Sequence, residues 1–358
     1  MHAWTPHVTI NLGAIRHNAC KALHLCPFGS RVWFVTKVAA GDEKIAGCLL
    51  KCGGFGLADS RLENLAGIKK TNPNTHTMLI RPAGLERAEE TVDLCDVSLE
   101  SAIENIAALG NSACKKGKIH NIIVMVEIGD LREGVPEDQA IKLVRDASKV
   151  SGINIEGIGS TLTCFAGVVP DHSHLDKMIT LRSRIESETG ISLKWISSGA
   201  TNTLPMALND TLPSQINDHR IGEGIILGTD VTDRGVLKGF RSDAFILTGE
   251  VIEVYTKPTV PTGRVAQNVS GHVQHFEDHG NRKRALLNFG MADVEPTLLT
   301  SLSKGVQVLG STSDHTILDV EDSSEQIKVG SKIDFLPGYG ALVRIMSSKY
   351  ISKVYKED

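Results

Sequence analysis

The sequence predicts an α/β fold, in which a (β/α)8 TIM-type barrel is followed by a mostly antiparallel β C-terminal domain. From residue 31 to about 228, short β-branched or aromatic runs alternate with amphipathic stretches at the spacing of strand–helix units. Beyond about residue 238, apolar and polar residues alternate, and Gly, Asn and Asp separate the runs. A Rossmann sheet is the weaker alternative, because no GxGxxG follows the first strand.

Eight strand candidates occupy the first region. They cover residues 32–38, 54–58, 76–81, 94–99, 121–129, 154–163, 193–199 and 218–224. Helix-like segments separate them, which favours parallel strands closed into a barrel with its active site at their C-terminal ends. We expect this barrel to span residues 13–237.

The remaining residues, 238–358, predict a C-terminal β domain of antiparallel strands. The stretch VTINL at residues 8–12 precedes the first helix and has no role in the barrel. We therefore expect residues 1–12 to add a strand to the C-terminal domain.

The composition is typical of a soluble protein that acts on a small molecule. Hydrophobic residues make up 41% and charged residues 22%, and the net charge of −4 gives no reason to expect nucleic acid. The N-terminus lacks a basic stretch followed by an apolar run, and no segment approaches the ~18 apolar residues of a membrane span. We expect a cytoplasmic protein without a membrane partner.

The cysteines and histidines do not predict a metal site. All seven cysteines lie between residues 20 and 164 without a CxxC, so reduced thiols are expected. Asp171-His-Ser-His174 has no second ligand cluster at a suitable spacing, and a polar loop is the expected structure.

Lys37 ends the first expected strand. Trp33, Val35 and Lys37 share one face of that strand, so the lysine would project into the barrel mouth. A lone lysine more often packs its stem and leaves its ammonium in water. The other strand ends must therefore decide its role.

Three further strand ends carry groups that suit a phosphorylated ligand. Small residues and backbone N–H groups gather in SSGATN, at residues 197–202, and in RIGEG, at residues 220–224. The turn after the fifth strand adds Arg132 to the same rim. A lysine near a phosphate site can neutralise charge, or it can form a Schiff base with the aldehyde of pyridoxal phosphate.

Several strings in this order resemble the alanine racemase family of fold-type III pyridoxal-phosphate enzymes, and most closely its ornithine-racemase-like branch. They are TKVAAGD (36–42), GDLREG (129–134), TLTCF (161–165), SSGATN (197–202), HRIGEGIILG (219–228) and the late polar turn GSTSDH (310–315). The resemblance implies a racemase that interconverts L and D amino acids by proton transfer at Cα, with ornithine, another basic amino acid, alanine or serine as substrate. It also implies a homodimer with shared active sites.

The resemblance assigns roles to individual residues. Lys37 would hold the cofactor covalently and act as acid and base on one face of Cα, and Arg220 would bond the pyridine nitrogen. Arg132 would lie near the phenolic oxygen and the substrate carboxylate, unless it is a turn arginine paired with Glu133. The residues that match phosphate-binding positions are Ser198, Gly199, Thr201, Gly222, Glu223 and, near the C-terminus, Tyr339, which could equally be a strand tyrosine of the core.

The chain departs from the better-known alanine racemases at three positions. Met291 stands where they carry the tyrosine that serves the opposite face of Cα, and methionine cannot transfer a proton. Cys164 replaces a ring-stacking histidine, and Gly41 replaces a tyrosine four residues after the lysine. The candidates for the missing second base stay open and are Asp293, Asp314 and His315.

Other functions compete with racemisation. A non-catalytic pyridoxal-phosphate homeostasis protein would not need the extra β domain, and a decarboxylase would release carbon dioxide. A D-amino-acid lyase with a metal in its β domain is disfavoured, because residues 165–358 contain no cysteine for the His/Cys site that such a resemblance requires.

Overall fold

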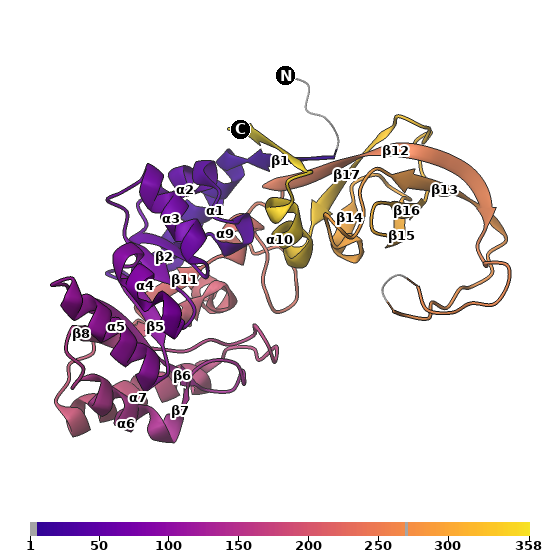
Figure 1. The fold of residues 1–358 in the computed structure, drawn as a ribbon. Coiled ribbons are helices and arrows are strands. Elements are labelled where there is room, and N and C mark those ends of the chain that lie inside the picture. Colours follow the sequence, from indigo (N-terminus) through magenta and orange to yellow (C-terminus); the bar gives the residue numbers. More distant parts are fainter. Residues whose placement is uncertain (1–5, 269–270) are drawn as a thin grey trace. The chain divides into compact units, whose positions relative to one another are not determined.

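The computed structural model describes residues 6–268 and 271–358, which form two compact units (Figure 1). Residues 15–241 make up the barrel unit. The described part of residues 1–14, together with residues 242–358, makes up the β unit.

A parallel sheet forms the wall of the barrel unit. Its order is β10-β11-β2-β3-β4-β5-β6-β8-β9, with β7 paired to β6. Since β9 pairs with β8, and β10, two residues further along the chain, pairs with β11, these two short strands bring the ends of the sheet together and nearly close the ring. The strands are β2 (Arg31–Val35), β3 (Gly56–Asp59), β4 (Thr77–Leu79), β5 (Val97–Glu100), β6 (His120–Glu127), β7 (Val135–Pro136), β8 (Ile153–Gly159), β9 (Trp195–Ser197), β10 (Gly199–Ala200) and β11 (Asp218–Ile221).

Helices connect successive strands, as right-handed parallel connections require. They are α1 (Leu12–Leu25), α2 (Glu43–Leu50), α3 (Leu62–Thr71), α4 (Ala88–Leu94), α5 (Ile103–Lys115), α6 (Glu137–Ala147), α7 (His172–Thr189), α8 (Leu204–Leu208) and α9 (Glu223–Ile226), with 3-10 turns η1 (Lys37–Ala39), η2 (Leu85–Arg87) and η3 (Thr201–Thr203). Within the described residues, no helix is both long and apolar enough to cross a membrane. The predicted barrel is confirmed, and each of the eight expected strands corresponds to an observed one.

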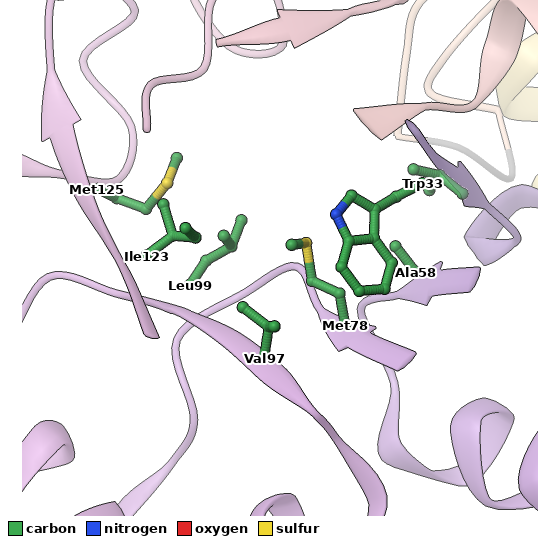
Figure 2. Packing of buried hydrophobic residues seen from close by; sticks show 8 residues of the cluster. Trp33, Ala58, Met78, Val97, Leu99, Ile123 and Met125 are labelled. Atoms are coloured by element: carbon green, nitrogen blue, oxygen red, sulfur yellow. The ribbon is translucent and has the colours of Figure 1, made fainter. Parts of the chain in front are cut away.

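The barrel interior is a packed apolar core rather than a pore. Every second residue of a strand points inward, so neighbouring strands contribute side chains to one cluster (Figure 2). The cluster consists of Trp33, Val35, Ala58, Met78, Val97, Leu99, Ile123 and Met125, all buried. This filling leaves the strand ends as the place for polar chemistry.

A buried ion cluster closes the N-terminal end of the barrel. The Arg31 guanidinium donates from Nε to Asp218 Oδ1 at 2.6 Å and from Nη1 to Glu156 Oε2 at 2.7 Å. It also lies 4.5 Å from the ring centroid of Trp195. Since removing one partner of a buried ion pair costs roughly 3–5 kcal/mol, this end of the barrel serves stability.

The β unit contains a sheet in the order β14-β17-β12-β13-β16-β15, and β1 pairs antiparallel with β12 and parallel with β18. The long strand β12 bonds β17 along its first half and β13 along its second. Its elements are β1 (His7–Asn11), β12 (Phe245–Pro258), β13 (Asn281–Leu287), η4 (Pro296–Leu298), β14 (Leu299–Ser301), β15 (Gln307–Ser311), β16 (Thr316–Asp319), β17 (Lys332–Pro337), α10 (Tyr339–Ser347) and β18 (Ser352–Lys356).

One part of the β unit differs from expectation. The stretch PGYGALVRIM, expected to lie in a strand, forms helix α10 from Tyr339 onward. Its apolar residues Ala341, Leu342, Ile345 and Met346 recur at helical spacing and are buried, a pattern that decides against a strand.

Candidate active site

Lys37 follows β2 directly but does not lie in it. The expected strand to residue 38 was too long, because the chain turns at Thr36 and Lys37 begins η1. The inward-facing alternation therefore stops at Val35. Lys37 is half-buried, and its ammonium forms no hydrogen bond or ion pair with residues 6–268 or 271–358. The position of the lysine is thus set by its backbone turn, and no described counter-ion fixes the amine.

Arg220 lies on β11, in register with Trp33 on β2. Its Nη2 donates to the carbonyl oxygens of Ser160, at 2.6 Å, and Ser197, at 2.9 Å. Its Nε is buried and finds no acceptor among the described residues. Burial lowers the pKa of this guanidinium. The arginine is fixed across the C-terminal ends of β8 and β9, and its buried Nε donor remains unused among the described residues.

The loop after β9 is joined to the start of α9 by Thr201. Its Oγ1 accepts the N–H of Gly222 at 3.3 Å and the N–H of Gly224 at 3.2 Å. A hydroxyl has two lone pairs and one proton, so these two bonds leave the proton free for an anion. Ser198 differs, because its hydroxyl is buried against the Ser160 hydroxyl at 2.8 Å.

The Glu223 side chain is not part of that cluster of N–H groups. Its carboxylate accepts from Arg234 Nη1 at 2.8 Å and from Thr229 Oγ1 at 3.0 Å. Burial raises the pKa of Glu223. The side chain is thus occupied, and the prediction that Glu223 binds a phosphate concerns its backbone N–H alone.

Arg132 lies on the exposed turn after β6. Its Nη2 donates to Glu133 Oε1 at 2.6 Å, the pairing of the turn-arginine alternative. The same oxygen accepts from Thr161 Oγ1 at 3.4 Å, and Arg220 Nη1 reaches that hydroxyl at 3.5 Å. Glu133, which the sequence did not single out as a site residue, thus stands between the two arginines.

The remaining predicted residues belong to the β unit. The Asp293 Oδ1 accepts from Ser348 Oγ at 2.6 Å, and the exposed Asp314 accepts from Ser313 Oγ at 2.6 Å. The His315 side chain is exposed. The segments that carry Asp293 and Asp314 approach closely at Gly290, which has no side chain. A Cβ at this position would lie 2.5 Å from the Ser313 carbonyl oxygen. Met291 and the three candidate bases therefore lie on two loops that are hydrogen-bonded to each other.

The two altered positions of the barrel unit have different surroundings. Gly41 has a φ of +65°, and a Cβ at this position would lie 2.6 Å from the Asn64 Cβ. No larger side chain fits there without rearrangement. Cys164 is exposed in the loop after β8.

The metal reading of Asp171-His-Ser-His174 finds no support in the geometry. Asp171 caps α7, because its Oδ1 accepts from His174 N at 3.1 Å and from Ser173 Oγ at 2.7 Å. Over the described ranges, no group of three or more His, Cys, Asp or Glu side chains is arranged to hold a metal ion.

Comparison with known proteins decides the family. The profile described as "Alanine racemase, N-terminal domain" matches residues 10–229, more than half of the chain. The chain belongs to the alanine racemase family. The racemase is 33% identical over 350 residues to an ornithine racemase of Acetoanaerobium sticklandii, covering 97% of this chain and 99% of that protein. It is 34% identical over 352 residues to a lysine racemase of Thermotoga maritima, covering 98% of each chain.

Solved structures show the same fold. The racemase superposes on alanine racemase of Clostridium difficile 630 with a TM-score of 0.74 at 17% identity, covering 100% of this chain and 97% of that one. A D-threonine aldolase of Filomicrobium marinum matches with a TM-score of 0.74 at 15% identity, covering 99% and 91%. The fold thus serves more than one reaction, and the sequence relationships identify this chain as a pyridoxal-phosphate-dependent amino-acid racemase.

The barrel mouth has groups that fit the cofactor. Arg220 Nε offers a donor without an acceptor to a pyridine nitrogen, and the Thr201 hydroxyl offers a proton to a phosphate. The Lys37 amine, free of any carboxylate among the described side chains, is available to an aldehyde.

Proposed function

We propose that this racemase acts on a basic amino acid, ornithine or lysine, and that Lys37 carries its cofactor. The names of the two relatives support the substrate, since each matches nearly the whole chain. Alanine and serine are the alternative substrates to be tested beside them.

When bound, pyridoxal phosphate supplies the electron sink that makes the Cα hydrogen of the attached amino acid acidic. Lys37 would hold the cofactor covalently, and its amine would remove or return the proton on one face of the substrate Cα. A lysine that starts a short 3-10 turn directly after a buried strand has a fixed backbone, so its amine has a restricted reach.

Arg220 is assigned to the pyridine nitrogen, and its unused Nε is the observation that carries the assignment. Arginine can only donate, so it leaves that nitrogen unprotonated. In this position Arg220, unlike a carboxylate, would not strengthen electron withdrawal by the cofactor, which would limit side reactions of the substrate carbon.

Phosphate binding is assigned to the backbone N–H groups of Glu223 and Gly222 and to the loop that carries Ser198, Gly199 and Thr201. The Gly222 N–H, which donates to Thr201 Oγ1 at 3.3 Å, would be shared with the phosphate. The Tyr339 hydroxyl is proposed as a further donor to the phosphate. Arg132 is proposed to orient the substrate carboxylate, with Glu133 fixing its guanidinium.

The second face of Cα requires a proton carrier other than Met291. We assign it to one of Asp293, Asp314 and His315, which lie on adjacent loops of the β unit. We further propose a cytoplasmic homodimer with shared active sites, in which residues 13–237 bind the cofactor and residues 238–358, with strand 1–12, complete a site.

The decisive experiment combines spectroscopy with a substrate panel. Purified protein with pyridoxal phosphate should absorb in the visible, and Lys37→Ala should lose that band. L-ornithine, L-lysine, L-alanine and L-serine are then incubated with the enzyme and resolved by chiral chromatography. A protein that never takes up the cofactor refutes the role of Lys37, whereas faster turnover of alanine or serine refutes only the basic substrate.

Single replacements locate the second base. Asp293→Asn, Asp314→Asn and His315→Gln are compared for exchange of the Cα hydrogen with deuterated water. The variant that lacks the base should exchange one enantiomer while forming little of the other. Full racemisation by all three would contradict the assignment.

A further inference from the structure

The turn that carries Lys37 is hydrogen-bonded to a buried side chain at the end of β3. Thr36, directly before the lysine, donates from Oγ1 to Asp59 Oδ2 at 2.8 Å. The other carboxylate oxygen, Asp59 Oδ1, accepts from Arg61 N and from Asn64 Nδ2, both at 3.0 Å. Thr36 and Asp59 are both 0% exposed. Hydrogen bonds to an ionised acceptor are stronger than hydrogen bonds between two neutral groups, so these contacts hold the turn firmly.

The same cluster also contacts the far end of the turn. Asn64, which Asp59 fixes, fills the space beside Gly41, where an added Cβ would lie 2.6 Å from the Asn64 Cβ. Gly41 in turn donates its N–H to the Thr36 carbonyl oxygen at 3.4 Å, closing the turn on itself. Asp59 therefore fixes residues on both sides of Lys37.

We infer that Asp59 is a positioning residue that, through Thr36 and Asn64, holds the Lys37 turn in the orientation needed to attach the cofactor. The inference rests on the proposed role of Lys37. A lysine amine reaches its target along four flexible methylene groups, so the direction of its Cα–Cβ bond decides where the amine can go. A shift of about 1 Å in a reacting group can cost roughly 100-fold in rate.

Two substitutions weaken the same contact from opposite sides. Thr36→Val removes the hydroxyl. Asp59→Asn keeps an oxygen for Arg61 and Asn64 but replaces the charged acceptor with a neutral amide N–H, so the Thr36 hydroxyl must accept that N–H and donate to the Ala58 carbonyl oxygen, 3.3 Å away, instead. Each should slow attachment of pyridoxal phosphate to Lys37 by roughly 10- to 100-fold. The double variant should be no slower than the worse single variant, because both remove one interaction. Thr36→Ser keeps the hydroxyl and should restore attachment.

The matched control is Glu100→Gln. Glu100 also ends a barrel strand, β5, is also 0% exposed, and accepts from Ala83 N at 3.1 Å, which lies in a different loop. This replacement exchanges a buried acidic side chain for its amide at the same depth without touching the lysine turn. It should leave attachment at the wild-type rate.

The measurement follows the visible absorption of the full-length protein after mixing with pyridoxal phosphate. Borohydride reduction and mass spectrometry then identify the labelled peptide and its yield. Slow labelling of Lys37 in Thr36→Val and Asp59→Asn, with normal labelling in Thr36→Ser and Glu100→Gln, supports the inference. Normal labelling in the first two, or equal loss in Glu100→Gln, overturns it. If wild-type protein is labelled elsewhere than Lys37, the proposed role of Lys37 fails, and that failure is read before any variant is made.

Discussion

The contact between Gly199 and His219 gives a sharp test of the proposed phosphate-binding loop. A Cβ added to Gly199 would lie 1.9 Å from His219 Nδ1, far inside van der Waals contact. His219 is 1% exposed, and burial lowers the pKa of His219 to about 4, so at neutral pH it is an uncharged side chain wedged beneath the loop. Gly199→Ala must therefore displace either the imidazole or the loop.

The expected cost follows from overpacking. Inserting one methyl group into a filled site destabilises a protein by roughly 1–3 kcal/mol. For a unit the size of residues 15–241, each kcal/mol lowers Tm by roughly 2–4 °C. If the loop moves, the Kd for pyridoxal phosphate rises as well, by about tenfold for each 1.4 kcal/mol of lost contact.

The rescue distinguishes this cause from a general defect. His219→Ala makes room for the new methyl group, so Gly199→Ala should cost less in the His219→Ala background than in wild-type protein. Thermal unfolding and fluorescence titration with the cofactor measure both quantities. Additive effects of the two substitutions, or a Gly199→Ala protein with unchanged Tm and Kd, would refute the reasoning.

Three further predictions concern single side chains at the strand ends. Thr201→Val removes the acceptor of two N–H groups and should raise the Kd for pyridoxal phosphate roughly tenfold or more. Thr201→Ser keeps the hydroxyl and should bind the cofactor normally. Equal binding by the two variants would show that the hydroxyl is not used. Arg220→Lys cannot span the carbonyl groups of Ser160 and Ser197 and should lose about 1–3 kcal/mol in a denaturant titration, with an unchanged midpoint as the contrary result. Burial raises the pKa of Glu100 to about 8, so folding holds a proton that the unfolded chain releases, and stability should fall as pH rises from about 4.5 towards 8. Glu100→Gln should flatten that slope in unfolding curves measured across this range, and an unaltered slope would exclude Glu100 as its source.

The pattern of apolar runs was sufficient to predict the barrel, because most of its strands are largely buried on both faces and helical segments alternate with them along the chain. Strand ends were less predictable. Val35 and Lys37 fall at alternate positions, as they would in a strand that continues to the lysine. The strand nevertheless ends before Lys37, because Thr36 takes a helical backbone conformation and its hydroxyl bonds Asp59. Such an end depends on a contact with a residue 23 positions away.

The structure also shows two side chains near the proposed site that a sequence pattern could not single out. Asp59 and Glu133 are carboxylates that follow strands, as many surface carboxylates do. One signal was available for Asp59, because a charged residue directly after the buried run GLA is unusual unless it is bonded. Nothing local marks Glu133, whose partner Thr161 is supplied by a different strand end.

The surroundings of Gly41 constrain how a tyrosine, the residue that the family resemblance implies at this position, could be introduced. Gly41→Tyr alone meets two obstacles, a left-handed backbone that costs a side chain roughly 1–2 kcal/mol and the Asn64 side chain already in the space. Asn64 must first shrink, which loosens its bond to Asp59. The glycine and tyrosine forms of this position are therefore separated by changes that must occur in a fixed order. Exchanging one for the other by mutagenesis would need to begin with Asn64 on α3, away from the lysine.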